Sequence, residues 1–302
     1  MIQRLTFAAA LLLAATPVLA NDSEAGIALG GLVLRPSKTV SMDAEDLYIS
    51  AEEIRVKYRF TNSGPKPVTT FIAFPLPDMP GVREFEDGEP AFDIDRINFS
   101  TLVDGKPASL GVAYTATVRG RSVKPRLDAL GWPMRWQGDE ELAGKIAMLT
   151  DEDRAARVAE GLLVMVDGVG YPAWRVTPHV TRTQTFPAGK TITVEHRYTP
   201  WTGGSVSGAL YASMRKEYPD IVADYQKRYC TDASFWAGFD KREAARAGSP
   251  TEGMAYAETW ISYILKSGAN WKGPIKDFRL VVDKGRASAL VSFCANGVKK
   301  IS

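Results

Sequence analysis

The seven residues Ile54-Arg55-Val56-Lys57-Tyr58-Arg59-Phe60 place an apolar side chain at every second position, with a cation between neighbours. Successive side chains of a strand point to opposite faces, so this segment predicts a strand with one buried and one charged face. Asn62-Ser63-Gly64-Pro65 is typical of a turn, and the β-branched and aromatic run at residues 68–74 predicts the next strand. One apolar face per strand indicates an antiparallel sheet that covers a core.

Further strands of this kind occur in both halves of the chain. Asp104-Gly105 separates apolar segments at residues 97–103 and 108–118 and predicts a short hairpin. Residues 174–186 and 191–198 flank a second turn, and residues 278–282 and 289–293 alternate around Asp283-Lys284-Gly285. Short strands separated by such turns predict a mainly β (α+β) protein, an antiparallel β-sandwich with helical insertions.

Two stretches have a helical period instead. Between residues 126 and 161 apolar side chains recur at three- and four-residue steps, and Thr150 before three acidic residues predicts a capped helix start. An apolar stripe follows from residue 207, where we expect Pro219 to begin a new helix. Without a clear linker, residues 21–302 are expected to form a single β-sandwich-based domain, with helical insertions at about 126–161 and 207–265.

The first twenty residues have the pattern of a secretory signal peptide. Arg4 precedes an apolar run at residues 5–15, and Val18-Leu19-Ala20 supplies the small residue before a cleavage site. The run is too short for a membrane span, and no later segment is long and apolar enough for one. Of the 37 basic and 35 acidic residues only Arg4 lies in the leader, so the exported chain is nearly neutral and has no charge signature for nucleic acid.

The two cysteines, Cys230 and Cys294, both lie after the leader. In an oxidising compartment an even number of cysteines predicts a disulfide, here closing a loop of about 65 residues. The chain-entropy model gives such a bridge roughly 4 kcal/mol. The alternative is a pair of buried free thiols.

Candidates for chemistry are few. The chain has two histidines: His196 lies on the apolar face of its strand and is expected in the core, and His179 is expected to face solvent. If the strands at 174–186 and 191–198 pair, the two histidines lie near each other, but without further ligands they make a weak metal site. No nucleophile elbow or zinc motif is present. We therefore expect no metal, no cofactor and no catalytic residue.

Two small groups remain as speculative binding residues. Asp43 and Glu45 share a face if their segment is extended. They either bind a cation or, as the simpler hypothesis, form a solvated acidic cluster at a strand edge. Trp132 and Trp136 lie in a segment rich in proline and glycine. Exposed indoles stack on sugars or anchor a partner chain, whereas buried ones fix the helical insertion to the sandwich.

Several segments resemble exported bacterial proteins grouped as the domain-of-unknown-function family DUF4424. The resemblance covers nearly all of the exported chain and rests on Gly30-Gly31-Leu32-Val33-Leu34, Glu45-Asp46-Leu47-Tyr48-Ile49-Ser50, Phe74-Pro75-Leu76-Pro77-Asp78, Gly268-Ala269-Asn270-Trp271 and residues 277–284. It implies a location in the envelope or periplasm of a Gram-negative bacterium and brings no known activity. Family members continue past residues 298–302, which implies that a final strand is missing here and its partner edge exposed.

A shorter resemblance concerns VIT domains, the β-sandwich modules of secreted and scaffold proteins. Tyr58-Arg59-Phe60-Thr61-Asn62, Phe74-Pro75-Leu76-Pro77 and Val103-Asp104-Gly105-Lys106 occur in the order that is similar to theirs. This resemblance implies an interaction module.

The sequence thus favours an exported, non-catalytic module that binds an unidentified envelope protein or glycan. One alternative is an envelope hydrolase that acts on polysaccharide or peptide through carboxylates such as Asp43, Glu45 or Asp78, which for a glycosidase lie about 5–9.5 Å apart. The other is a carbohydrate-binding module that uses Trp132 and Trp136.

Overall fold

The computed structural model describes residues 23–28, 31–34, 37–79, 94–206, 210–246, 256–261, 263 and 271–294. The predicted signal peptide at residues 1–20 lies outside the described residues. So do residues 247–255 and 264–270, in and just after the second predicted helical stretch.

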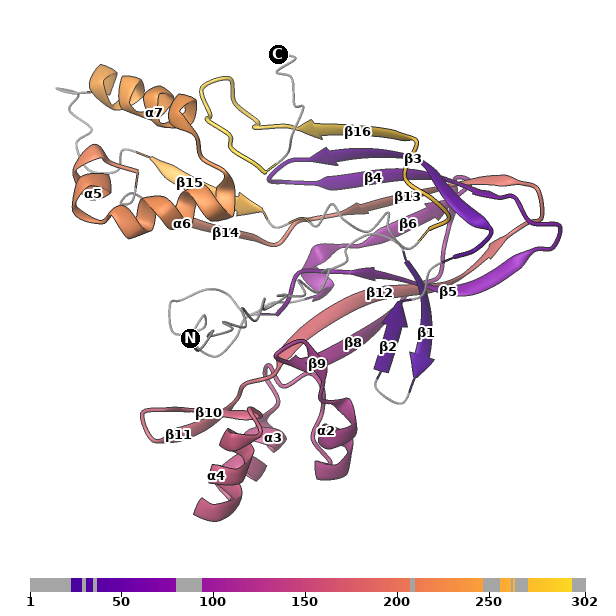
Figure 1. The fold of residues 1–302 in the computed structure, drawn as a ribbon, viewed down its shortest axis with the longest axis horizontal. Helices are drawn as coiled ribbons and strands as arrows, with labels where there is room; N and C mark the ends of the chain where they lie inside the picture. The colour runs from indigo at the N-terminus through magenta and orange to yellow at the C-terminus, as the bar shows by residue number, and fades with distance from the viewer. Residues whose placement is uncertain are drawn as a thin grey trace, which may run out of the picture.

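Two large β-sheets form the body of the protein (Figure 1). In the described residues the first has the order β2-β1-β5-β12-β8-β9, with strands Gly31–Leu34, Ser23–Ala28, Val68–Pro75, Arg175–Phe186, Gly111–Val118 and Arg121–Ser122. The second has the order β16-β3-β4-β13-β6-β7, with strands Asp277–Val282, Val40–Ile49, Ile54–Asn62, Thr191–Tyr198, Ser100–Val103 and Lys106–Pro107. Neighbouring strands are antiparallel, except that β16 runs parallel to β3.

The core lies between these sheets. The alternation in β4 works as predicted, because Val56, Tyr58 and Phe60 are fully buried while the intervening cations reach the outer face. Rings meet across the two sheets: Phe60 contacts Phe186 with centroids 5.7 Å apart, and Phe74 contacts His196 at 5.2 Å. The mainly β class and the sandwich predicted from the strand pattern are confirmed.

One predicted strand pairing is wrong, and a second pairing that the sequence leaves open does not occur. The Asp104-Gly105 turn does join a hairpin, with positive φ at both residues, but its second arm is only Lys106–Pro107. The longer strand β8 leaves for the opposite sheet and pairs with β12. Likewise β12 and β13 do not pair, since their connection passes from one sheet to the other. The short connection between β12 and β13 at residues 187–190 therefore marks a change of sheet rather than a hairpin.

The chain after β16 also differs from the prediction. Residues 289–293 were expected to return as a strand, but in the structure they are irregular. This segment instead contacts the helices: Leu290 lies against Gly238, and the Ser292 hydroxyl donates to the carbonyl of Tyr229 at 2.7 Å. This segment thus contacts the helices through Leu290 and Ser292, while Val291 of the alternating set is exposed.

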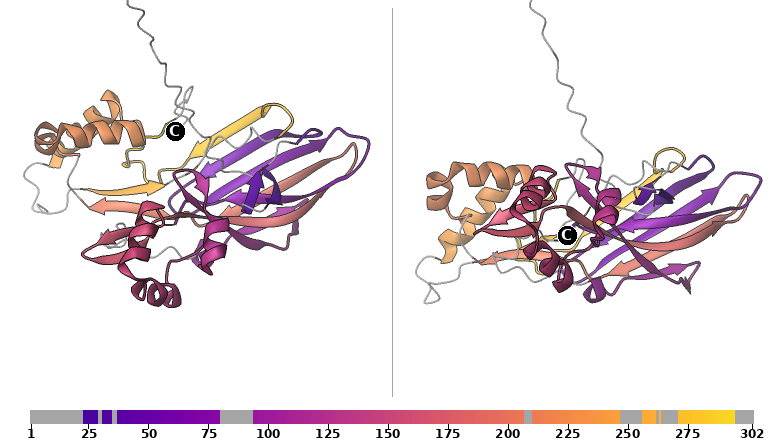
Figure 2. Two further views of the ribbon diagram at one scale, coloured as in Figure 1. Left: turned by 60° about the horizontal axis from the view of Figure 1, so that its bottom comes forward. Right: turned by 90° about the horizontal axis from the view of Figure 1, so that it is seen from below.

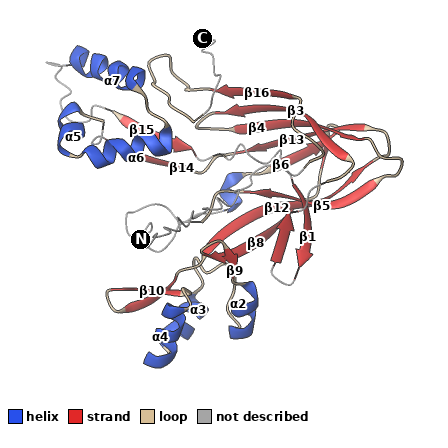
Figure 3. Cartoon of the chain, viewed as in Figure 1, coloured by secondary structure: helices blue, strands red, loops and turns tan. Residues whose placement is uncertain are grey.

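The helices form two groups, blue in Figure 3, that lie toward the same end of the sandwich (Figure 2). The first group contains α2, α3 and α4 with the hairpin β10–β11, at Lys124–Leu130, Glu140–Ala147, Asp151–Ala159, Leu163–Val166 and Val169–Pro172. A single 3₁₀ turn, Ile94–Ile97, precedes β6. Thr150 caps α4 as predicted, since its hydroxyl accepts from the Asp153 amide at 3.1 Å.

The second group contains α5, α6 and α7, at Ala212–Glu217, Pro219–Tyr229 and Ala233–Arg246. These helices lie in the chain between the two strands of a small antiparallel sheet, β14 at Thr202–Val206 and β15 at Ala257–Ile261. We call α5, α6 and α7 the helical lobe. Pro219 starts α6, as expected for a residue without a backbone N–H. The lobe has a small core of its own around Leu210, Trp236 and Phe239. In the described part of the chain, every helix falls short of the length and apolar character that a membrane crossing requires.

Candidate functional site

The helical lobe contains a groove of about 580 Å³ between α6 and α7, beside Arg215 of α5. Its volume lies in the range of small-ligand sites, about 300–1,000 Å³, but the groove is open to solvent and six of its nine lining residues are exposed. The lining residues are Arg215, Pro219, Val222, Ala223, Gln226, Ala233, Trp236, Ala237 and Asp240.

The spacing of these residues explains the groove. Residues 219, 222, 223 and 226 on α6 and residues 233, 236, 237 and 240 on α7 follow the same i, i+3, i+4, i+7 pattern. Each set therefore occupies one face of its helix. Ala223, Ala233 and Ala237 are too small to fill the space between the two faces, which leaves a mainly apolar trough.

Three of the lining residues interact with one another through an ion pair and a cation–π contact. Nη2 of Arg215 donates to Oδ1 of Asp240, so a bond between α5 and α7 crosses the lobe. The Arg215 guanidinium carbon also lies 5.0 Å from the centre of the Trp236 ring, within cation–π range. Arg215 thus covers the indole and has its charge balanced by Asp240.

Two donors in the groove lack an acceptor. The Nε1 atom of Trp236 and the Nε atom of Arg215 are buried, and neither has a hydrogen-bond partner among the described residues. Buried N–H groups are almost always paired, and leaving one unpaired costs about 1–3 kcal/mol. A ligand's acceptor would remove that cost only after Arg215 rotates, because neither nitrogen has accessible surface in the groove as it stands.

A second cluster, of a tyrosine, a tryptophan and one carboxylate, lies between α6 and β15. The Tyr225 hydroxyl and the Trp260 indole N–H both donate to Oε2 of Glu258, at 3.0 and 2.9 Å. Burial, and then the nearby Glu258 charge, raise the pKa of Tyr225 well above its usual value. Tyr225 therefore stays a neutral donor, and the cluster holds α6 against β15.

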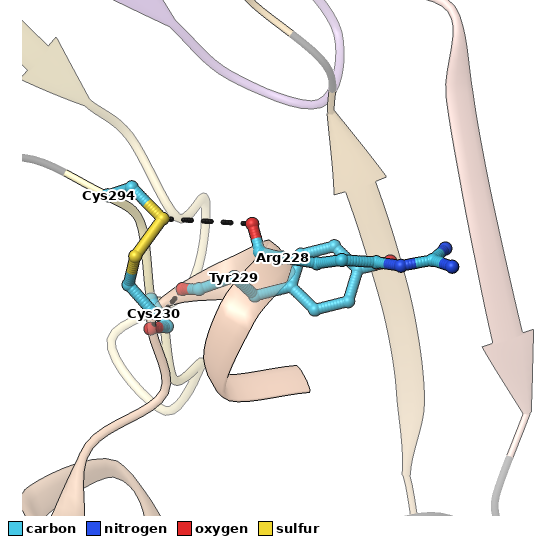
Figure 4. The surroundings of a disulfide bond; sticks show 5 residues. Arg228, Tyr229, Cys230 and Cys294 are labelled. Atoms are coloured by element: carbon cyan, nitrogen blue, oxygen red, sulfur yellow. Dashed lines mark hydrogen bonds between the residues drawn. A yellow bond between two sulfur atoms is a disulfide. The ribbon is translucent and has the colours of Figure 1, made fainter. Parts of the chain in front are cut away.

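A disulfide joins the lobe to the C-terminal segment (Figure 4). The two cysteines that the sequence predicts to pair, Cys230 and Cys294, have Cα atoms 5.2 Å apart. Cys230 follows the last residue of α6 in a left-handed conformation, and Cys294 follows the segment that leaves β16. The bond therefore ties the end of α6 to a segment that begins in the sandwich.

The structure does not bring Trp132 and Trp136 to the surface. Trp132 is 6% and Trp136 is 9% exposed, and both belong to the main core. Trp132 stacks on Trp174 with centroids 6.0 Å apart, and Trp136 donates its indole N–H to the Trp174 carbonyl at 3.1 Å. With both rings buried, the hypothesis of a sugar-stacking surface at these residues loses its basis, because packing onto the sandwich uses the same faces.

Asp43 and Glu45 do not form the shared, solvated face that was expected. A β-bulge between Met42 and Ala44 adds one residue to β3, which separates the two carboxylates. Glu45 stands opposite the buried Tyr58 and is only 2% exposed. Asp43 stays near the outer face beside Thr61.

The environment of Asp43 is that of a structural ion pair. Lys276 donates to Oδ1 of Asp43 at 2.7 Å, and Ser41 donates to the same atom at 2.9 Å. Burial alone would raise the pKa of Asp43, but the hydrogen bonds from Lys276, Thr61 and Ser41 outweigh it and lower that pKa. The pair joins β3 to the residues that lead into β16.

Asp78, the third carboxylate considered for hydrolysis, lies beyond β5 in the other sheet. It accepts hydrogen bonds from Arg175 and from the Thr177 hydroxyl. Asp43 and Asp78 thus belong to different sheets and each has its own partners. Among the described residues no group of three His, Cys, Asp or Glu side chains is placed to hold a metal ion.

The histidines occupy separate places. His196 is fully buried as expected, and its Nδ1 lies 2.7 Å from the Thr101 hydroxyl. His179 was expected to face solvent, but it is only 6% exposed, and its Nε2 lies 3.0 Å from the Thr115 hydroxyl. Burial lowers the pKa of His179 to about 4, against a smaller opposing effect of Asp78.

Because His179 is buried and neutral, we expect the protein to lose stability in mild acid. In the unfolded chain this histidine takes up a proton near pH 6.5, whereas in the folded protein it does so only near pH 4. The free energy of unfolding should therefore fall from about pH 6.5 to pH 4, by up to about 3 kcal/mol from this group. Urea unfolding at a series of pH values measures this fall in the free energy of unfolding.

His179→Gln is the matched variant for that measurement, because glutamine keeps a donor near Thr115 without titrating. The variant should show a flatter dependence over the same pH range. Equal slopes in the two proteins would mean that His179 is not the group responsible.

The described residues therefore define a β-sandwich protein with a ligand-sized groove in an attached helical lobe. The chain belongs to the family described as Domain of unknown function (DUF4424), which matches residues 20–302. No curated protein matches the chain.

One similar solved structure comes from Legionella pneumophila subsp. pneumophila str. Philadelphia 1 and bears the name "putative nutrient binding protein". It has 15% sequence identity and a TM-score of 0.29, and the match covers 59% of this chain and 41% of that chain. A likeness of this degree carries no argument about function.

Sequence reasoning missed the groove. The stripe in residues 207–229 was identified as an apolar face, but Trp236 was not linked to it. The signal that would have found it is the repeated spacing at 219, 222, 223, 226 and 233, 236, 237, 240, with small residues on both helices.

Proposed function

We propose that this protein is an exported, periplasmic binding module without catalytic activity, and that its ligand occupies the groove of the helical lobe. The observation that carries the proposal is the groove itself: an open, mainly apolar trough whose lining residues Arg215 and Trp236 each carry a buried, unpartnered donor. Apolar walls with a few placed polar groups are the usual features of a binding site.

Three features support export. The leader at residues 1–20 has the pattern of a signal peptide, and the family match begins at residue 20, where that leader ends. The Cys230–Cys294 bond suits an oxidising compartment. The periplasm is the location that the family resemblance implies.

Binding suits the groove better than catalysis does. Its charged groups, Arg215 and Asp240, balance each other in an ion pair, so neither is poised as a free nucleophile or base. The carboxylates considered for hydrolysis, Asp43 and Asp78, have partners in two different sheets.

Ala237→Trp tests the proposal, because the larger ring would fill the trough between α6 and α7. Purified residues 21–302, wild type and variant, would be incubated with periplasmic extract, separated from unbound material and unfolded, and the released compounds identified by mass spectrometry. We expect compounds that wild type retains and Ala237→Trp loses.

Val112→Thr is the control, since Val112 is an exposed apolar residue on β8 rather than in the lobe. It should retain the same compounds as wild type. Equal retention by wild type and by a folded Ala237→Trp variant, or retention of nothing by wild type, would contradict the proposal.

A further inference from the structure

We infer that the groove selects a small organic molecule with an apolar body and an uncharged hydrogen-bond acceptor, such as an amide or ester carbonyl, bound through Trp236 and Arg215. This inference rests on the proposed function and adds the chemical class of the ligand. Three properties of the groove lead to it: the kind of its unpartnered groups, the balance of its charges, and its size.

The unpartnered groups are both donors. An indole Nε1–H and a guanidinium N–H donate and never accept. Both nitrogens are buried on residues that line the groove, and Trp236 as a whole is only 9% exposed. A ligand that satisfies them must supply acceptor atoms, which excludes a pure hydrocarbon or an ammonium ion as the matching partner.

The charge balance selects an uncharged acceptor. Arg215 already neutralises Asp240, and the Arg215 side chain is 18% exposed. A carboxylate ligand would place a second negative charge beside Asp240, where like charges oppose each other. A carbonyl oxygen accepts the same N–H groups without that cost.

The size fits a compact molecule rather than a polymer. The lining on each helix spans eight residues, which places its ends about 10 Å apart along the axis at 1.5 Å per residue. With a volume of about 580 Å³, the groove holds a molecule of the size of a capped amino acid, whose apolar side chain would lie against Val222, Ala233 and Ala237. Arg215 covers the indole, so its rotation would give the acceptor access to Trp236.

Two probes that differ in one group test the inference. N-acetyl-L-leucinamide is uncharged, and N-acetyl-L-leucine has a carboxylate in place of the terminal amide. Each would be titrated into residues 21–302 while the indole N–H signals are followed by NMR, with Trp236 assigned through Trp236→Phe. We expect a saturable shift of the Trp236 signal, with Kd at least about tenfold lower for the uncharged probe.

Variants separate recognition from folding. Trp236→Phe keeps a ring but loses the donor. Followed through the backbone amides of α6 and α7, it should bind the uncharged probe about tenfold more weakly, the effect of one lost hydrogen bond. Asp240→Asn removes the opposing charge and should shift the preference toward the carboxylate probe. Asp224→Asn, an exposed α6 position paired with Arg228, should change neither affinity.

Equal or tighter binding of the carboxylate probe by wild type would overturn the inference, as would the absence of any shift with either probe up to its solubility limit. In either case the periplasmic compounds lost in Ala237→Trp still decide the proposed function separately, because that experiment does not depend on the ligand class.

Discussion

Replacing Trp132 with alanine is expected to lower the free energy of unfolding by about 3–5 kcal/mol, the usual cost of removing a large buried aromatic side chain. Trp132 is 6% exposed and stacks on the fully buried Trp174, whose indole N–H donates to the Met134 carbonyl at 2.7 Å. The cavity would open between the α2 segment and β12, where the remaining backbone is fixed by hydrogen bonds. Guanidinium chloride unfolding measures the change.

Trp132→Phe is the companion variant, because it keeps an aromatic ring and should lose less stability than alanine. Neither change should alter retention of groove ligands, since Trp132 lies in the main core and not in the lobe. A loss of less than about 1 kcal/mol for Trp132→Ala would contradict its buried position and restore an exposed, sugar-stacking ring as a hypothesis.

Removing the Cys230–Cys294 bond is expected to cost roughly 4 kcal/mol of stability, from the chain entropy of a loop whose ends are 64 residues apart. The lobe should be affected first, because its own core contains only three buried side chains among the described residues, Leu210, Trp236 and Phe239. The double variant Cys230→Ala/Cys294→Ala would be compared with wild type by denaturant unfolding, and hydrogen exchange would locate the loosened helices.

A reducing agent provides the control for that comparison. It should destabilise wild type to about the level of the double variant and leave the double variant unchanged. If wild type and double variant unfold at the same denaturant concentration, the bond does not stabilise the fold and the lobe has another anchor.

The parts of the fold that follow from local pattern could be predicted from the sequence. The alternation in residues 54–60 gives β4 its two faces, Thr150 caps α4, and Pro219 begins α6. Each of these features depends on residues within one turn or one strand, so the local sequence is sufficient to predict it.

The errors have non-local causes. The bulge at Asp43 reverses the side on which Glu45 lies, and β3 would read as a regular strand without its partner β4. The sheet change after Lys106–Pro107 depends on β12, whose partner β8 is more than fifty residues earlier. Residues 289–293 alternate like a strand, but Leu290 and Ser292 contact α7 and the end of α6, which lie far from them in the sequence.

The candidate site also depends on packing between distant segments. The position of Trp132 and Trp136 in a segment rich in proline and glycine suggested exposed rings, yet the sandwich buries both. Trp236 lies in an ordinary helical stretch, and only the packing of α7 against α5 and α6 places it beside Arg215 over a trough.

The most direct test of the groove as the binding site is an amide and indole NMR map of residues 21–302 with the small-molecule fraction of periplasmic extract. The account predicts shifts confined to the lobe, at Arg215, on the α6 face from 219 to 226 and on the α7 face from 233 to 240. Shifts centred on the segment of Trp132 and Trp136 or on the outer sheet faces, with the lobe unchanged, would contradict it.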